Sequence, residues 1–136
     1  MKLRRVAVLL VALIWVAALT GCEWFFAPQS EGSADNPVEI YVGIPYEGSI
    51  GRWGTSYYTF VTFATGSHTV AVTNTESDLH WDLWNSAWVL IASCQQVFGA
   101  GDEIDTVSLV EDQTYYLTVD ENDWQAGNFT ITVTFP

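Results

Sequence analysis

The sequence predicts an all-β fold, a single antiparallel β-sandwich of eight or nine short strands. From Val38 to Phe135 apolar and polar residues alternate almost throughout, as in strands that have one buried and one solvated face. Turn-forming residues interrupt this alternation about every ten residues. No window carries apolar residues at helical spacing together with capping residues. Short strands separated by frequent turns are typical of a sandwich.

The strands follow one another along the whole domain. The clearest spans residues 129–135, where apolar side chains at odd positions alternate with Thr at even positions. The other expected strands are 38–42, 46–50, 57–63, 69–73, 79–84, 87–92, 103–110 and 114–119. The inward positions predict a core that includes Tyr58, Phe60, Val70, Val72, Leu79, Trp81, Leu83, Tyr115, Leu117, Val119, Phe129, Ile131 and Val133.

Six short motifs, in this order, resemble the bacterial pre-peptidase C-terminal domain. They are Gly48, Tyr58-Thr59-Phe60, the Gly-led strand from Gly66, Ser77-Asp78-Leu79-His80-Trp81-Asp82-Leu83, the Tyr115-Tyr116 strand and the hairpin Gly127-Asn128-Phe129. The resemblance covers residues 37–136. It implies a jelly-roll-like sandwich, appended to many secreted peptidases and found in other exported proteins.

The resemblance also implies a candidate calcium site, because some family members bind calcium between the Asp-rich strand and the N-terminal linker. In this chain the ligands would be Asp78 with Asp35, Asn36 or Glu31. Two departures weaken that implication. Ser56 and Tyr57 stand where an Asp commonly precedes the Tyr-x-Phe strand, and His80 replaces a second Asp. Solvated acids at strand ends are the alternative.

The N-terminus resembles a bacterial lipoprotein precursor. Lys2, Arg4 and Arg5 precede an apolar run over residues 6–18, and Leu19-Thr20-Gly21-Cys22 resembles a lipobox. The run is shorter than the ~20 residues of a membrane-spanning helix. We therefore expect a signal peptide over residues 1–21, a lipid on Cys22, a tether over 22–36 and one domain over 37–136.

From this organisation we expect the protein in the bacterial cell envelope, attached to a membrane through its lipid anchor. Glu23 follows the cysteine where the inner-membrane retention signal of enteric bacteria has Asp. In a host with two membranes we therefore expect the outer one. Trp24, Phe25 and Phe26 lie next to the lipid, and aromatic rings favour the headgroup region.

The charge of the mature chain excludes several partners. The sixteen acidic side chains of residues 22–136 are opposed by Arg52 alone, a formal charge of −15. Nucleic acid and anionic lipid headgroups select for basic patches, so neither is expected to bind. The acidity suits solubility, divalent-cation binding or a saline habitat. Cys94 lies in an apolar run and has no expected disulfide partner, which predicts a buried thiol.

Catalysis is not expected, because the chain shows neither a nucleophile–base pair nor metal-ligand spacing. Asp78 and Asp82 would lie roughly 13 Å apart on one strand, too far for a glycosidase pair or for one calcium ion. Zinc or copper binding by His80 with Asp78 or Asp82 is a less favoured alternative. No cofactor other than calcium is expected.

The sequence therefore predicts a non-catalytic binding or adhesion module, with a protein or polysaccharide as its ligand. The alternative is a carbohydrate-binding module that uses exposed tryptophans. Trp53 and Trp124 are expected on loops and Trp84 on a solvated strand face. Indole rings stack on sugars and fill partner pockets. Three coplanar rings on one face would favour sugar, and scattered rings would favour a protein contact.

Overall fold

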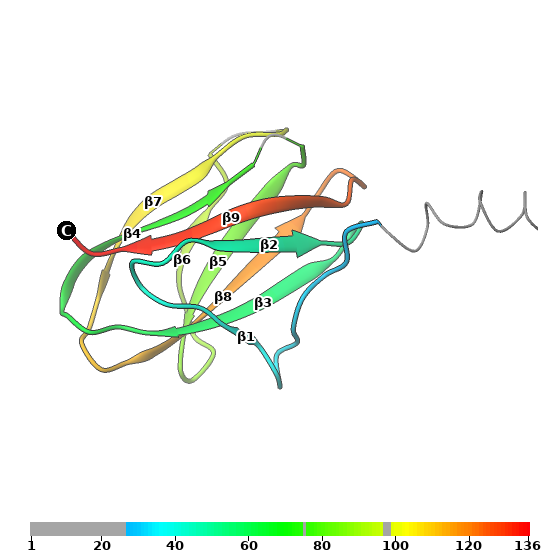
Figure 1. The fold of residues 1–136 in the computed structure, drawn as a ribbon. Helices are drawn as coiled ribbons and strands as arrows, with labels where there is room; N and C mark the ends of the chain where they lie inside the picture. Colours follow the sequence, from blue (N-terminus) through cyan, green and yellow to red (C-terminus); the bar gives the residue numbers. More distant parts are fainter. Residues whose placement is uncertain (1–26, 75, 97–98) are drawn as a thin grey trace, which may run out of the picture.

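The computed structural model describes residues 27–74, 76–96 and 99–136 as a β-sandwich of nine strands (Figure 1). The all-β prediction is confirmed. The strands are β1 (Val38–Glu39), β2 (Tyr46–Ile50), β3 (Thr55–Val61), β4 (Gly66–Thr73), β5 (Leu79–Asn85), β6 (Leu90–Cys94), β7 (Glu103–Leu109), β8 (Thr114–Glu121) and β9 (Gly127–Thr134).

Two sheets face each other across the core. The five-stranded sheet has the order β1-β3-β8-β5-β6, and the four-stranded sheet has the order β2-β9-β4-β7. All pairs are antiparallel except β1 with β3, which are parallel. The alternation of apolar residues does not distinguish these two directions, so the parallel pair was not predicted.

The sixth strand differs most from its expected bounds. The expected strand began at residue 87, but β6 begins at Leu90. The Asn85 side chain accepts hydrogen bonds from the amides of Ala87 and Val89, at 2.9 and 3.0 Å, and so closes a turn. Trp88 in this turn has a φ of 58°. A side-chain cap of this kind competes with strand pairing.

The core holds all thirteen expected residues, each at most 6 % exposed. Ile40, Ile50, Leu109 and Cys94 join them. Trp81 is fully buried, and its indole donates a hydrogen bond of 3.0 Å to the Glu103 carbonyl oxygen. Cys94 is buried as expected. Its burial, and to a lesser extent the nearby Glu103 carboxylate, raise the pKa of the thiol to about 11. The thiol is therefore protonated at neutral pH.

The N-terminal segment, residues 27–37, lies against the sandwich. Ser49 Oγ donates to the Gln29 carbonyl oxygen at 2.7 Å, and the Gly51 amide donates to Ser30 Oγ at 3.0 Å. The Glu31 amide donates to Ser56 Oγ at 2.9 Å. The described part of the expected tether is thus attached to β2, to the following turn and to β3.

One end of the sandwich carries the first described residues. In Figure 1 the blue segment begins at the end where β2 and β8 finish, and the C-terminus lies at the opposite end. No helix in the described part of the chain has the length and apolar character needed to cross a membrane. Cys22 and the aromatic residues 24–26 lie outside the described residues.

Candidate functional site

Polar and aromatic side chains share the outer face of the five-stranded sheet. On β5, His80, Asp82 and Trp84 are half-buried and alternate with the buried residues of the core, as the sequence predicted. They lie opposite Asp120, Thr118 and Tyr116 of β8, respectively. The outer face thus carries a polar group near the end where the chain enters and an aromatic group toward the other end.

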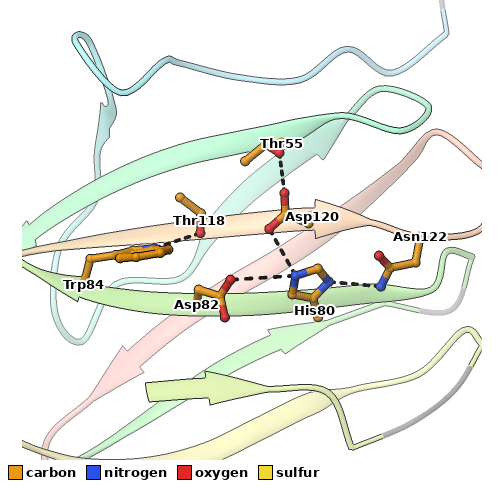
Figure 2. A network of polar contacts seen from close by, with 7 residues as sticks. All are labelled: Thr55, His80, Asp82, Trp84, Thr118, Asp120 and Asn122. Carbon is orange, nitrogen blue, oxygen red and sulfur yellow. Dashed lines mark hydrogen bonds and ion pairs between the residues drawn. The ribbon is translucent and has the colours of Figure 1, made fainter. Parts of the chain in front are cut away.

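The polar group brings one imidazole and two carboxylates together (Figure 2). His80 Nε2 lies 3.2 Å from Asp120 Oδ2 and 3.8 Å from Asp82 Oδ2. One ligand atom from each of the three side chains lies within 4.8 Å of the others. Of the described residues, these form the group with the donor set and spacing of a metal site.

Two neighbours hold the polar group in place. The Asn122 amide nitrogen lies 3.0 Å from His80 Nδ1, and the Thr55 hydroxyl donates to Asp120 Oδ1 (Figure 2). The hydrogen bond to Asp120 raises the pKa of His80 above its usual value, and burial opposes it. Burial alone would raise the pKa of Asp120, but hydrogen bonds from His80 and Thr55 lower it overall.

The aromatic group lies on the same sheet face. The Trp88 ring stacks on Tyr116, with centroids 4.3 Å apart and planes 4° apart, and the Trp84 ring is tilted by 54° against Trp88. Trp84 Nε1 donates to Thr118 Oγ1 at 3.0 Å. Beside it, the β5–β6 turn and β6 expose apolar side chains, namely Val89 (56 %), Leu90 (49 %) and Ile91 (42 %).

Two further indoles meet at the end where the chain enters. Trp53 and Trp124 are 59 % and 61 % exposed, and their rings form an edge-to-face pair with centroids 5.7 Å apart. Both have positive φ, 51° and 67°, which is a true outlier for so bulky a residue. The buried Glu121 carboxylate accepts the Trp53 amide at 2.7 Å and the amides of two hairpin residues. Strained backbone of this kind is typical of recognition sites.

A groove of about 630 Å³ adjoins this pair. The docked N-terminal residues form one wall, and Arg52 and Ala126, neighbours of the two tryptophan turns, form the other. Arg52 is the single basic residue after Cys22 and forms no ion pair with any described residue. The groove therefore presents a cation that no described residue neutralises, near two exposed indoles.

The residues expected to bind calcium lie on different elements. The Glu31 carboxylate accepts hydrogen bonds from the Tyr58 and Tyr46 hydroxyls, at 2.8 and 3.4 Å. Asp78 precedes β5, where its carbonyl oxygen accepts the Asn122 amide at 2.9 Å. Two strand spacings, about 10 Å, separate β5 from β3, and the N-terminal segment lies beyond β3. Asp35 is exposed in a turn that Ser33 and Asn36 close by exchanging amide hydrogen bonds of 3.1 Å. Calcium binding stays a prediction, supported by Asp78 Oδ1, which is buried and forms no hydrogen bond with any described residue.

The sequence predicted only part of each cluster. His80, Asp82 and Trp84 were placed correctly on one face, but their partners come from β8 and the β5–β6 turn. These partners are set by which strands pair and in which register, and the periodicity of apolar residues does not predict strand pairing. The signal available in sequence was the outward alternation of Tyr116, Thr118 and Asp120 in β8.

Comparison with known proteins identifies the fold. No family model and no curated protein matches the sequence. Among solved structures, the pre-peptidase C-terminal domain of a collagenase from Bacillus anthracis matches with a TM-score of 0.61 and 19 % identity, over 77 % of this chain and 97 % of that one. The chain has the fold of a pre-peptidase C-terminal domain. The expected architecture is thereby confirmed.

The pre-peptidase C-terminal fold is shared more widely. CorA, a surface-associated copper-binding protein of Methylomicrobium album BG8, matches with a TM-score of 0.53 and 9 % identity, over 74 % of this chain and 98 % of that one. The Yersinia pseudotuberculosis-derived mitogen matches with a TM-score of 0.52 and 13 % identity, over 68 % of this chain and 85 % of that one. At these identities the likeness shows the fold alone.

The His80–Asp120 pair predicts a pH-dependent stability in buffer that contains EDTA. A raised histidine pKa stabilises the folded state below the unfolded pKa of about 6.5, and this contribution is lost as pH rises through the folded pKa. The lowered pKa of Asp120 adds stability to the folded state at pH values above the unfolded pKa of about 4, and this stability is lost in acid. Urea unfolding should show His80→Asn costing up to about 1 kcal/mol more at pH 5.5 than at pH 8.5. Asp82 and Asp120 are the ionisable groups that face the imidazole. An equal cost at both pH values would contradict the pairing.

Proposed function

We propose that this chain is a non-catalytic binding module, exported and anchored to a membrane of the cell envelope through lipid on Cys22. The N-terminal sequence supports the anchor. The fold supports the binding role, since CorA, which shares it, is described as a surface-associated copper-binding protein. The observation that carries the proposal is that exposed aromatic side chains lie at both ends of the sandwich, Trp53 and Trp124 where β8 ends and Trp88 where β8 begins.

The surface at the end where the chain enters faces the membrane. Because residues 27–37 are bound to the sandwich, the five Cα–Cα steps from Cys22 to Ala27 alone span the gap, and they reach at most about 18 Å. The Trp53–Trp124 pair therefore lies within reach of the headgroups, where indoles are favoured. Arg52 lies beside the pair and offers a charge to a lipid phosphate. The overall charge of −15 restricts this contact to membranes of low surface charge.

The surface at the other end binds the partner. β6 is the outer strand of its sheet, and it exposes the apolar side chains of Leu90 and Ile91 where natural edge strands usually carry charge or proline. Trp88 and Tyr116 extend this apolar area. A protein that adds a strand to β6 would bury it. Two copies of so acidic a chain repel each other, so the partner is a different, neutral or basic protein.

A polysaccharide ligand is the second candidate, supported by the two exposed indole clusters. The arrangement of the rings favours protein contact over this alternative. Trp53 and Trp124 are edge to face, and Trp88 and Tyr116 each cover one face of the other. The indoles of the described residues thus do not form a flat platform of three coplanar rings.

The anchor is tested by Cys22→Ala in cells supplied with a fatty-acid probe. The wild-type chain should be labelled and should fractionate with membranes. The variant should lose the label and accumulate as a slower-migrating precursor, because the cleavage follows lipid attachment. Unchanged labelling of the variant would contradict the anchor.

The partner surface is tested by a photo-crosslinking residue at Leu90, with Val61 as the matched control. Both positions are exposed and apolar, at 49 % and 56 %, but Val61 lies on β3, away from β6. Irradiation of intact cells should give a discrete crosslinked protein from position 90 and none from position 61. A crosslink to a second copy, or equal crosslinking at both positions, would contradict the proposed partner.

A further inference from the structure

A metal ion fits between the three side chains of the polar group. Two ligand atoms that each lie about 2.1 Å from a tetrahedral zinc ion are about 3.4 Å apart. The separations of His80 Nε2 from Asp120 Oδ2 and Asp82 Oδ2, 3.2 and 3.8 Å, bracket this value. The remaining separation is below 4.8 Å, so a small rotation of the carboxylates would close the set around one ion.

The donor set selects the class of ion. One imidazole nitrogen and two carboxylate oxygens suit zinc, copper or nickel. Calcium takes six to eight oxygen ligands, about twice what these side chains offer. This group is therefore chemically distinct from the calcium site that the sequence suggested around Asp78.

The ligands are oriented before an ion binds. His80 and Asp120 are directly opposed on paired strands, so the backbone fixes their separation. The Thr55 hydroxyl holds one oxygen of Asp120 and leaves the other toward the imidazole (Figure 2). Turned by 180°, the Asn122 side-chain amide would place its oxygen where its nitrogen now lies, accept a hydrogen bond from His80 Nδ1–H and leave Nε2 free for the ion. Partners of this kind typically support metal ligands.

The electrostatic setting also favours a cation. The chain after Cys22 carries sixteen acidic side chains and one arginine, and that arginine lines the groove beside the N-terminal segment. No lysine or arginine is therefore available to neutralise Asp82 and Asp120. A divalent ion would relieve the repulsion between these two carboxylates. The His80 imidazole relieves it only when it is protonated.

We propose that His80, Asp82 and Asp120 bind a divalent transition-metal ion on the outer face of the five-stranded sheet. The ion links β5 to β8 and keeps a coordination position for water or for a side chain of a bound partner. The site is independent of the lipid anchor, because its three ligands belong to the folded domain.

The test is calorimetric titration of the full chain, purified in detergent, with Zn²⁺ at pH 7.5. The wild-type chain should show one site well resolved from diffuse binding to its acidic surface. His80→Asn and Asp120→Asn should each weaken that site at least tenfold. Asp105→Asn is the matched control, since it removes the same charge from an exposed position on β7 of the other sheet.

A second readout identifies the ligand. Cu²⁺ bound to the wild-type chain should show magnetic coupling to one imidazole nitrogen, and His80→Asn should lack it. The other histidine, His68, is fully buried. Zn²⁺ should also raise the melting temperature of the wild-type and Asp105→Asn chains only, and the same melts show whether each variant folds. Equal weakening by Asp105→Asn and Asp120→Asn, or Ca²⁺ binding as tight as Zn²⁺ binding, would overturn the proposal.

Discussion

The attachment of residues 27–37 to β2 and β3 is the constraint on which the rest of the account depends. At its centre the Glu31 carboxylate accepts the hydroxyls of Tyr58, which is fully buried, and Tyr46. Two glycines make room for this contact. A Cβ at Gly48 would lie 2.7 Å from the Tyr58 hydroxyl, and a Cβ at Gly54 would overlap Ser30 Oγ. The segment is therefore built into the sandwich, and the path of the chain toward Cys22 has a fixed starting point.

That starting point gives the two ends of the molecule different roles. The Trp53–Trp124 pair, Arg52 and the groove lie where the chain enters, and the exposed apolar residues of β6 lie on an edge strand away from that segment. A long flexible tether would let either surface meet the membrane. With only four residues between Cys22 and Ala27, the lipid would hold one end at the bilayer and leave the β6 edge accessible. The two functional proposals are thus consequences of one packing arrangement.

The fold was predictable because burial alternates with period two in nearly every strand, from Tyr58 and Phe60 to Ile131 and Val133. The sites were predictable only in part. Alternation placed His80 and Asp82 on the outer face, but it could not say that Asp120 would lie opposite His80, because that depends on the register between β5 and β8. Loop composition correctly predicted that Trp53 and Trp124 are exposed. The contact between the two rings depends on Glu121. Its buried carboxylate accepts three backbone amides, one from the turn that holds Trp53 and two from the turn that holds Trp124. A run of acidic residues in sequence suggests only a solvated loop.

The orientation at the membrane is tested most directly by tryptophan fluorescence of the full lipidated chain. The vesicles would combine phosphatidylethanolamine and phosphatidylcholine whose acyl chains carry bromine at known depths. We expect shallow bromines to quench the wild-type fluorescence. This quenching should fall in the Trp53→Phe/Trp124→Phe double variant and stay unchanged in Trp84→Phe/Trp88→Phe. Trp24 contributes equally to both variants and so cancels. Quenching that disappears with Trp84 and Trp88 instead would show that the other end faces the bilayer, and the central claim would be wrong.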